Sequence, residues 1–414
     1  MNKSKVVFSN LMWRFFERCG AQGVSFIVSL VLARILMPEM YGTVALMNVV
    51  INLLTIFISS GMGAALVQKK NADDLDFSSM FYFNIVMCCT LYAVLFFCAP
   101  AIADFYKTPE MTAYLRVIGI TLIISGVKNI QSSYVSRNLM FKRFFFATLG
   151  GTIGAGVIGI AMALSGFGVW ALITQSLFNN FVDTVILWIT VKWRPKKMFS
   201  FKRLGGLFSY GWKLLVSAFL DTGYREVRTL IIGKVYNSTD LAYYNKGESF
   251  PKLLVDNINS AITSVLFPVM SKEQDNAENM KLIIKRSITV SCYLLAPLIM
   301  GMFAVAPVLI RVLLTDKWAF CVPYLQVFCI VYLMYPLHTA NLNAVRAVGR
   351  SDLFLVLEIA KKVIGISALI IAIPYGVFAI AISVLLSDVV ALIINSYVNH
   401  RLFKYGFLKQ MRDI

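Results

Sequence analysis

The sequence has little charge for its length, and acidic residues are especially few. Charged side chains make up 14% of the 414 residues, against about 25% in soluble globular domains. Lysine and arginine together number 39, whereas aspartate and glutamate number only 21. The low charge excludes an ordinary soluble domain. The basic excess raises the alternative of a nucleic-acid-binding protein, and the distribution of the charge decides that question.

Histidines and paired cysteines are also scarce. The chain has two histidines, His338 and His400, and seven cysteines, no two of which form a C-x-x-C pair. The cysteines lie in apolar segments, where we expect them to pack as small hydrophobic side chains. We therefore predict neither a metal site nor a disulfide framework.

Long apolar segments occupy most of the chain instead. Hydrophobic residues make up 58% of the sequence, and segments of about 20 residues, enough to cross a bilayer, follow one another. The first is too long for a signal peptide, so we expect no cleaved signal. The fold class that we predict is an all-α polytopic membrane protein with about twelve transmembrane helices. They lie at 11–36, 41–66, 77–103, 111–136, 144–165, 168–191, 206–233, 240–268, 282–310, 320–345, 353–373 and 376–400.

Basic residues alternate between the predicted loops. Loops and chain ends on one side of the membrane, together with Lys285 and Arg286 at the start of the span 282–310, hold 23 lysines and arginines. The loops on the other side hold 4. The positive-inside rule then places both termini and the basic segment 192–205 in the cytoplasm. Because this asymmetry accounts for the basic excess, we predict membrane lipids, and no nucleic acid, as partners.

The two halves of the chain resemble each other. "SGFGVWALITQSL" at 165–177 parallels "IPYGVFAIAISVL" at 373–385, and "FSNLMWR" parallels "FSYGWK" at the start of each half. Six spans in each half begin and end on the same membrane face, so the repeats are parallel. We therefore predict two pseudo-symmetric six-helix bundles. They are an N-terminal lobe at 1–191 and a C-terminal lobe at 206–414, joined by a cytoplasmic basic linker at 192–205.

Charged residues interrupt the predicted span at 206–233. Within "LLVSAFLDTGYREVRTLIIGKVY", Asp221, Arg225 and Arg228 follow helical spacing and share one face, while Glu226 points away from it. A charge at mid-membrane costs at least ~2.5–3.5 kcal/mol on insertion scales, so this face requires water or a partner charge. Mutual neutralisation of Asp221 and Arg225 is one interpretation, but it does not account for Arg228.

Other predicted spans also contain ionisable residues, and cations dominate among them. A hydrated cationic cavity suits an anion such as a phosphate or diphosphate, because arginine offers a planar fork to phosphate oxygens. The candidate residues for this cavity are Arg18, Arg225, Arg228, Lys246 and Lys128. Carboxylates inside membranes often carry ions, and the candidates for coupling are Glu17, Asp183 and Asp221.

Two further groups of polar residues have simpler interpretations. In the second span, Asn48 and Asn52 share a face with hydroxyl residues, and we expect such neutral groups to form hydrogen bonds between helices. Near the predicted cytoplasmic end of the eleventh span, Glu358, Lys361 and Lys362 are interpreted as a surface cluster that reaches the membrane edge.

Segments along the whole chain resemble one known family. They are "LARILMPEMYG", "SGMGAALVQKK", "GFGVWALITQ", "KWRPKKMFSF", "LIIGKVYNSTDLAYYNKGESF", "VLFPVMSKEQD" and "PLHTANLNAVRAVGRSDLFLVLEIAKKVIG". These segments resemble the Wzx-type polysaccharide flippases of the multidrug/oligosaccharidyl-lipid/polysaccharide superfamily. Within that family, the most similar branch is that of colanic-acid and teichuronic-acid exporters.

The resemblance implies two six-helix lobes around a central cavity in the bacterial cytoplasmic (inner) membrane, with no catalytic residues and no cofactor. It implies flipping of undecaprenyl-diphosphate-linked oligosaccharide to the outer leaflet, for O-antigen, capsule or exopolysaccharide synthesis. Other membrane proteins of polysaccharide assembly are expected as partners. The driving force stays open between a proton or sodium gradient and consumption of the product. At 223–228 this chain has "GYREVR" where the branch commonly has neutral, Asn-rich residues, so Arg225, Glu226 and Arg228 are not carried over from the family.

Three alternatives have different sequence signatures. A drug or metabolite antiporter of the same superfamily should prefer acidic and aromatic cavity residues, and the bias here is the reverse. A membrane glycosyltransferase or polymerase should present carboxylates or histidines on loops outside the bilayer, whereas the outer loops here are short. A major-facilitator transporter should have a basic Gly-Asp loop after its second span, and "LVQKKNADDLD" lacks it.

Overall fold

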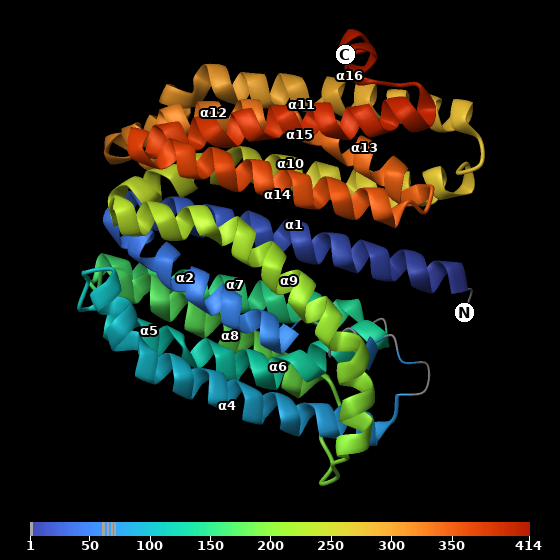
Figure 1. The fold of residues 1–414 in the computed structure, drawn as a ribbon. Helices are drawn as coiled ribbons and strands as arrows, with labels where there is room; N and C mark the ends of the chain where they lie inside the picture. Colours follow the sequence, from blue (N-terminus) through green and yellow to red (C-terminus); the bar gives the residue numbers. More distant parts are fainter. Residues whose placement is uncertain (1–2, 60–62, 64–65, 68, 70–71, 139) are drawn as a thin grey trace. The chain divides into compact units, whose positions relative to one another are not determined.

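The computed structural model describes residues 3–59, 63, 66–67, 69, 72–138 and 140–414, without the side chains of 3–12, 14–19, 141, 209–210 and 351. Every regular element in this part of the chain is a helix, as predicted (Figure 1). The first helices are α1 (Lys3–Ile35), α2 (Pro38–Ser59), α4 (Asp74–Phe105), α5 (Met111–Ile118), α6 (Ile120–Arg137), α7 (Phe141–Leu164), α8 (Val169–Thr190) and α9 (Phe201–Val235). They are followed by α10 (Ser238–Lys272), α11 (Ala277–Leu314), η1 (Asp316–Cys321), α12 (Val322–Leu333), α13 (Tyr335–Ala347), α14 (Ser351–Ala372), η2 (Ile373–Tyr375), α15 (Val377–Phe403) and α16 (Phe407–Arg412).

Local sequence signals determine where several helices begin and end. Asp73 caps α4: its carboxylate accepts a hydrogen bond from the Asp76 N–H at 3.0 Å, and the Asp76 carboxylate accepts one from the Asp73 N–H at 3.2 Å. The turn between α7 and α8 has Gly166 at φ +82° and Gly168 at φ +55°, a region that side chains disfavour. This turn contains the "SGFG" of the first repeat segment, so its glycines are required by the backbone.

Nine helical segments of the described chain are long and apolar enough to cross a membrane, and they coincide with nine of the predicted spans. The predicted spans at 206–233 and 353–373 are also helical, in α9 and α14, but both contain several charged residues. In α1 the apolar part is the shorter segment Gly20–Ile35. The predicted fold class is thus confirmed: the chain is a multi-pass helical membrane protein.

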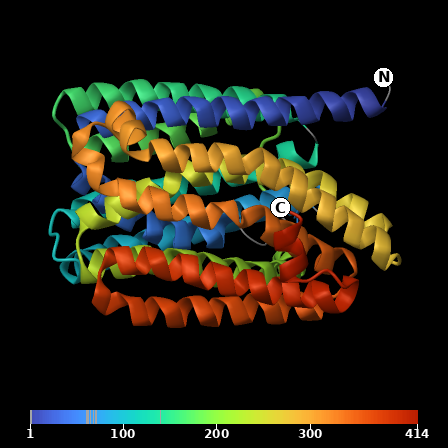
Figure 2. The same cartoon turned by 90° about the horizontal axis from the view of Figure 1, so that it is seen from above.

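Contacts between helices divide the chain into two compact units, Met1–Thr239 and Asp240–Ile414. In the first unit α7 packs against α1 and α8, α4 against α6, and α9 against α2 and α4; α1 runs along α7 in both ribbon views (Figures 1 and 2). In the second unit α11 packs against α12 and α13, and α15 packs against α12, α13 and α14. The helix that we predicted to open the C-terminal lobe, α9, therefore has its packing partners in the first unit. The division of the sequence into two six-span repeats stays a prediction.

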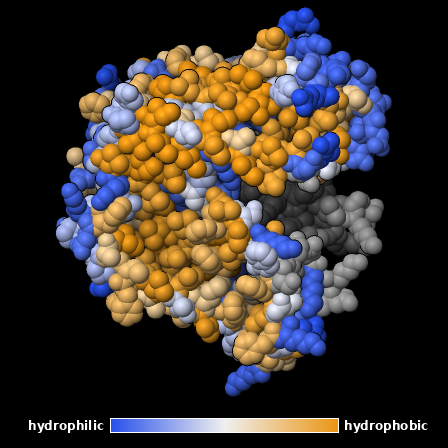
Figure 3. Space-filling model, viewed as in Figure 1, coloured by the Kyte–Doolittle hydropathy of each residue, from blue (hydrophilic) through white to orange (hydrophobic). Residues whose placement is uncertain are grey.

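Each unit exposes large apolar side chains, as a membrane protein requires. Phe97 and Ile189 in the first unit, and Tyr293 and Ile371 in the second, are more than two thirds exposed. Hydrophobic side chains cover much of the visible face of each unit (Figure 3). Water-soluble monomers rarely expose contiguous apolar patches of more than a few hundred Å², so these faces are suited to lipid.

The basic segment 192–205 is anchored on the first unit. Trp193 is buried in a hydrophobic cluster there, and its indole N–H donates to Asp74 Oδ1 at 3.0 Å. Arg203 Nη2 lies 3.4 Å from Asp73 Oδ2. The pKa of Asp73 is held below its usual value by the hydrogen bond from the Asp76 backbone N–H, and Arg203 adds to this effect. The acidic start of α4 thus fixes the predicted linker to the helices before it.

Candidate functional site

The charged residues of α9 occupy two faces of the helix, as their spacing predicts. Arg225 Nη2 lies 3.4 Å from Asp221 Oδ2, and both side chains are more than half exposed. Glu226 is directed to α2, where it accepts a hydrogen bond from Asn52 Nδ2 at 3.1 Å. The bond to Glu226 confirms the predicted contact between helices for Asn52. For Thr55 and Ser59 the prediction was wrong, because their hydroxyls donate to backbone oxygens of α2 itself, at 2.7 and 3.0 Å. Glu226 therefore serves helix packing, and the face that contains Asp221 and Arg225 is left for another role.

Arg228 of α9 has a guanidinium N–H that lacks a hydrogen-bond acceptor among the described residues. Its Nε is buried and has no hydrogen-bond partner among the residues that the structure describes. Its guanidinium carbon lies 5.6 Å from the ring centroid of Tyr224, within the range of a cation–π contact. A buried N–H without an acceptor costs about 1–3 kcal/mol, and more on a charged group. An anion that reached this helix would remove that cost.

Lys128 and Asp183 bind each other within the first unit. Lys128 Nζ on α6 lies 2.6 Å from Asp183 Oδ2 on α8, and the Asp183 side chain is only 10% exposed. Its second oxygen, Oδ1, is buried and has no hydrogen-bond partner in the described part of the chain. Lys128 was predicted to line the anion cavity, and Asp183 was predicted to couple an ion. The geometry gives each residue a second role, which is mutual neutralisation between two packed helices.

The remaining candidates lie in the second unit or have side chains outside the described residues. Glu17 and Arg18 belong to the helical backbone of α1, but their side chains are outside the described residues. Lys246 lies on α10 in the second unit, and its Nζ is 5.7 Å from the ring centroid of the buried Trp318. That these residues share one cavity with Arg225 and Arg228 stays a prediction.

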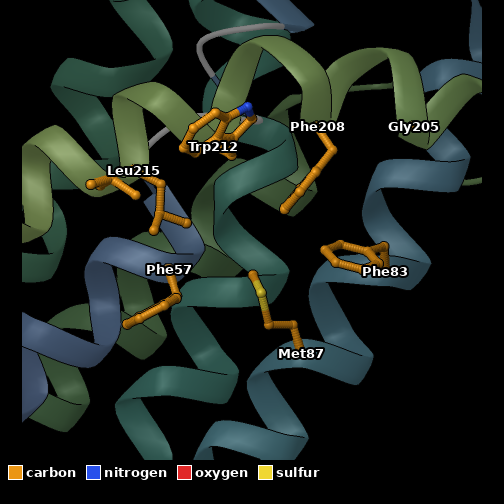
Figure 4. A pocket seen from close by; sticks show the side chains of 8 residues that line it. Phe57, Phe83, Met87, Gly205, Phe208, Trp212 and Leu215 are labelled. Atoms are coloured by element: carbon orange, nitrogen blue, oxygen red, sulfur yellow. The ribbon is translucent and has the colours of Figure 1, made fainter.

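An apolar pocket of about 630 Å³ lies between α2, α4 and α9 of the first unit. Phe57 of α2 and Phe83 and Met87 of α4 lie opposite Phe208 and Trp212 of α9 (Figure 4). Apolar and aromatic side chains dominate this lining, which suits a hydrocarbon chain better than a sugar or a phosphate. This pocket was not predicted from the sequence, because its residues look like ordinary lipid-facing or core positions of three different spans.

The second unit contains a polar pocket that the sequence analysis also missed. It has a volume of about 380 Å³ and is lined by α10, α13, α14 and α15, including His338, Asp388, Glu358 and Lys361. Glu358 and Lys361 form an ion pair, and their side chains are 29% and 17% exposed. The interpretation of Glu358 and Lys361 as a surface cluster was therefore wrong for these two residues. The feature of the sequence that could have indicated this pocket is the presence of ionisable residues in three consecutive predicted spans.

Comparison with curated proteins gives relatives in polysaccharide synthesis. Residues 31–323 match the family described as polysaccharide biosynthesis protein. The succinoglycan biosynthesis transport protein ExoT of Rhizobium meliloti is 26% identical over 78% of this chain and 65% of its own length. The teichuronic acid biosynthesis protein TuaB of Bacillus subtilis is 26% identical over 72% and 62%. The lipopolysaccharide biosynthesis protein WzxC of Escherichia coli is 20% identical over 97% and 81%. The chain thus spans somewhat less than two thirds of the first two relatives.

Solved transporter structures share the fold. The lipid II flippase MurJ, in its inward closed conformation, matches with a TM-score of 0.75 at 14% identity, over 98% of this chain and 89% of that one. An inward-facing MATE family transporter of the MOP superfamily matches with a TM-score of 0.69 at 14% identity, over 92% and 96%. At these identities the likeness concerns the fold alone. The family match covers well over half of the sequence, and the chain therefore belongs to the polysaccharide biosynthesis protein family.

Proposed function

We propose that the protein flips oligosaccharides linked to undecaprenyl diphosphate from the cytoplasmic to the outer leaflet of the bacterial inner membrane, for the synthesis of a surface polysaccharide. The family supports this assignment, and so do the names of its relatives, which refer to succinoglycan, teichuronic acid and lipopolysaccharide biosynthesis. The protein then acts as a transporter and not as an enzyme. Membrane proteins that polymerise the delivered glycan are its natural partners.

The observation that carries the proposal is the state of Arg228. A lipid-linked oligosaccharide presents a diphosphate between its hydrocarbon chain and its sugars, so a transporter must bring an anion through the membrane. Arg228 offers a buried donor without a partner among the described residues, on a helix that also carries the exposed Arg225. Charge-assisted bonds between guanidinium and phosphate are stronger than neutral hydrogen bonds. These two arginines are therefore the proposed contacts of the diphosphate, with Arg18, Lys128 and Lys246 as further candidates.

The apolar pocket of the first unit also supports a lipid-linked oligosaccharide as substrate, because it suits the hydrocarbon chain of such a molecule. The pocket is bordered by α9, the helix that carries Arg225 and Arg228, and Gly205 and Phe208 of its lining lie near the start of that helix. A substrate with a hydrocarbon chain and a diphosphate could contact α9 with both groups, the chain at the pocket and the diphosphate at the two arginines. We assign the pocket to a segment of the polyprenyl chain.

A drug or metabolite antiporter is the competing function, because MATE family transporters share the fold. Such a protein would need an anionic or aromatic site for cationic compounds. Arg228, with its unsatisfied donor, and the exposed Arg225 are both positively charged and would repel a cationic substrate. The charge of α9 therefore favours the lipid-linked anion.

The test removes the gene from cells that keep the rest of their surface-polysaccharide genes. We expect lipid-linked oligosaccharide to accumulate and the surface polysaccharide to disappear, and the intact gene to restore both. Extracted lipids are measured by mass spectrometry. Unchanged lipid-linked pools together with a new sensitivity to cationic drugs would favour the antiporter.

A further inference from the structure

His338 is held between two side chains of α15 at the wall of the polar pocket in the second unit. Its Nε2 lies 3.2 Å from Asp388 Oδ2, and its Nδ1 lies 3.0 Å from Asn395 Nδ2. Because an amide nitrogen only donates, Nδ1 accepts this bond and the proton of a neutral imidazole resides on Nε2. The Nε2–H then donates to the Asp388 carboxylate. This arrangement is that of a neutral histidine beside a charged aspartate.

Asn395 has an unused acceptor in this arrangement. Its Oδ1 is buried and has no hydrogen-bond partner among the described residues. If Nδ1 of His338 gains a proton, it becomes a donor and faces the Asn395 N–H donor. A half-turn of the amide would bring Oδ1 to the Nδ1–H and form a new bond. The side chain of Asn395 can therefore serve both protonation states of His338, and its acceptor is satisfied only in the protonated one.

The pocket gives water access to this pair. Its volume of about 380 Å³ would hold roughly a dozen waters, at about 30 Å³ each. The charged residues in its lining are Arg346 of α13, Glu358 and Lys361 of α14, and Asp388 of α15. Helix α10 contributes only neutral groups to it, Asn259 and Thr263, and α12 has no charged residue.

The other charges near the pair are already engaged. Glu358 and Lys361 pair with each other, and the Arg346 guanidinium lies 4.1 Å from the ring centroid of Phe354. On α11, Lys285 pairs with Asp413 at 2.9 Å. The titratable group that contacts the Asp388 carboxylate is thus the imidazole of His338. A proton that binds the pair changes its charge from −1 to 0.

The state of the pair is linked to the packing of α13 against α15. Asn399, one turn beyond Asn395, donates from Nδ2 to the backbone oxygens of Asn395 and Asn341 at 3.1 Å. Asn341 in turn exchanges two hydrogen bonds with Gln410 of α16, each 2.9 Å long. All of these amides are fully buried. A turn of the Asn395 amide would therefore occur at the contact between the two helices.

We propose that His338, Asp388 and Asn395 form a proton-binding site in the second unit. A proton from water in the pocket binds Nδ1 of His338, Asp388 balances the imidazolium charge, and the Asn395 amide turns to accept the new N–H. The site differs from the coupling candidates Glu17, Asp183 and Asp221. That the site couples a proton gradient to transport rests on the proposed flippase function; the proton-binding site itself does not.

The chain makes a direct titration possible because it has only two histidines. His400→Gln, at an exposed position, leaves His338 as the only imidazole of this chain, which is purified through a tag without histidine. Nitrogen-15 NMR of labelled histidine in lipid nanodiscs then reports its tautomer and charge. We expect the Nε2–H tautomer at high pH and a doubly protonated ring at lower pH. One unchanged neutral tautomer in spectra recorded from pH 5 to pH 9 would contradict the proposal.

Two variants in the His400→Gln background test the two partners of His338, and they should shift its titration midpoint in opposite directions. Asp388→Asn removes the negative charge that stabilises the imidazolium, so the midpoint should fall by a pH unit or more. Asn395→Asp replaces the amide with a group that accepts from Nδ1–H and cannot donate to it, so the midpoint should rise by a similar amount. Midpoints that do not respond to either change would show that His338 titrates without these partners and would refute the site.

The coupling role has a separate measurement. In vesicles that contain the protein and a lipid-linked oligosaccharide, flipping is compared with and without an imposed pH gradient. His338→Gln should reduce the ratio of the two rates to one, while wild type keeps a ratio clearly above one. An undiminished ratio in the variant would refute coupling through this site. If wild type flips nothing, the proposed function fails, and the titration of His338 still decides whether the proton site exists.

Discussion

Lys128 of α6 and Asp183 of α8 form an ion pair inside the first unit, with Nζ 2.6 Å from Oδ2. Each residue alone looks like a functional group in a membrane helix, and together they neutralise each other. Breaking a buried pair by removal of one partner costs about 3–5 kcal/mol, because the other charge stays buried. The pair thus has a sufficient structural reason to exist.

The first prediction follows from this pair. Asp183→Asn should lower the stability of the protein by up to about 3 kcal/mol, because the Lys128 side chain is 27% exposed and water partly solvates the remaining charge. The double variant Lys128→Gln/Asp183→Asn should recover most of that loss. Thermal unfolding in detergent, compared among the three proteins, measures this. If Asp183→Asn is as stable as wild type but its transport no longer responds to an ion gradient, Asp183 is a coupling carboxylate.

The second prediction concerns the diphosphate. Arg228→Gln should reduce export by about tenfold or more, since the loss of 1.4 kcal/mol of binding is a factor of ten. Arg228→Lys should have a smaller effect, because the charge stays and the planar fork is lost. Export is normalised to the amount of protein in the membrane. A normal rate per molecule with low abundance would mean that Arg228 serves folding alone.

The third prediction uses two adjacent glycines of α9. A Cβ on Gly205 or on Gly206 would meet no heavy atom within 4 Å, but only Gly205 lines the apolar pocket. Gly205→Phe should fill the pocket and reduce flipping by about tenfold, because exclusion of two CH₂ groups costs about 0.8 kcal/mol each. Gly206→Phe is the matched control. Equal rates for the two variants, whether both normal or both low, would exclude the pocket as the site of the polyprenyl chain.

The fourth prediction is topological. Lys197→Cys in the basic segment should react with a membrane-impermeant maleimide only after the cells are opened, and Glu110→Cys should react in intact cells. Native cysteines are replaced first, since Cys89 and Cys98 are exposed in the structure. The orientation rests on the distribution of basic residues between the loops. The reverse labelling pattern would overturn it.

Sequence periodicity predicted the helices well, because apolar runs of bilayer length have few alternative structures. It also predicted that Asp221 and Arg225 share a face while Glu226 does not, since helical spacing fixes direction. It could not predict that Lys128 contacts Asp183, because the two residues are 55 positions apart and nothing in a single sequence reports such a pairing. The His338–Asp388 contact, 50 positions apart, was missed for the same reason. The packing of α9 against α2 and α4 could not be predicted either, because similarity between the two halves of a sequence does not determine which helices contact each other.

The central claim is that this chain moves a lipid-linked oligosaccharide across a bilayer. The most direct measurement reconstitutes the purified protein in liposomes that carry this lipid, extracted from cells that lack the gene. A membrane-impermeant oxidant added outside then reports how much glycan is accessible. We predict that nearly all of the glycan becomes accessible with the wild-type protein, and that the Arg228→Gln protein reaches this level about tenfold more slowly. Accessibility that stays at the half expected for a static bilayer would contradict the account.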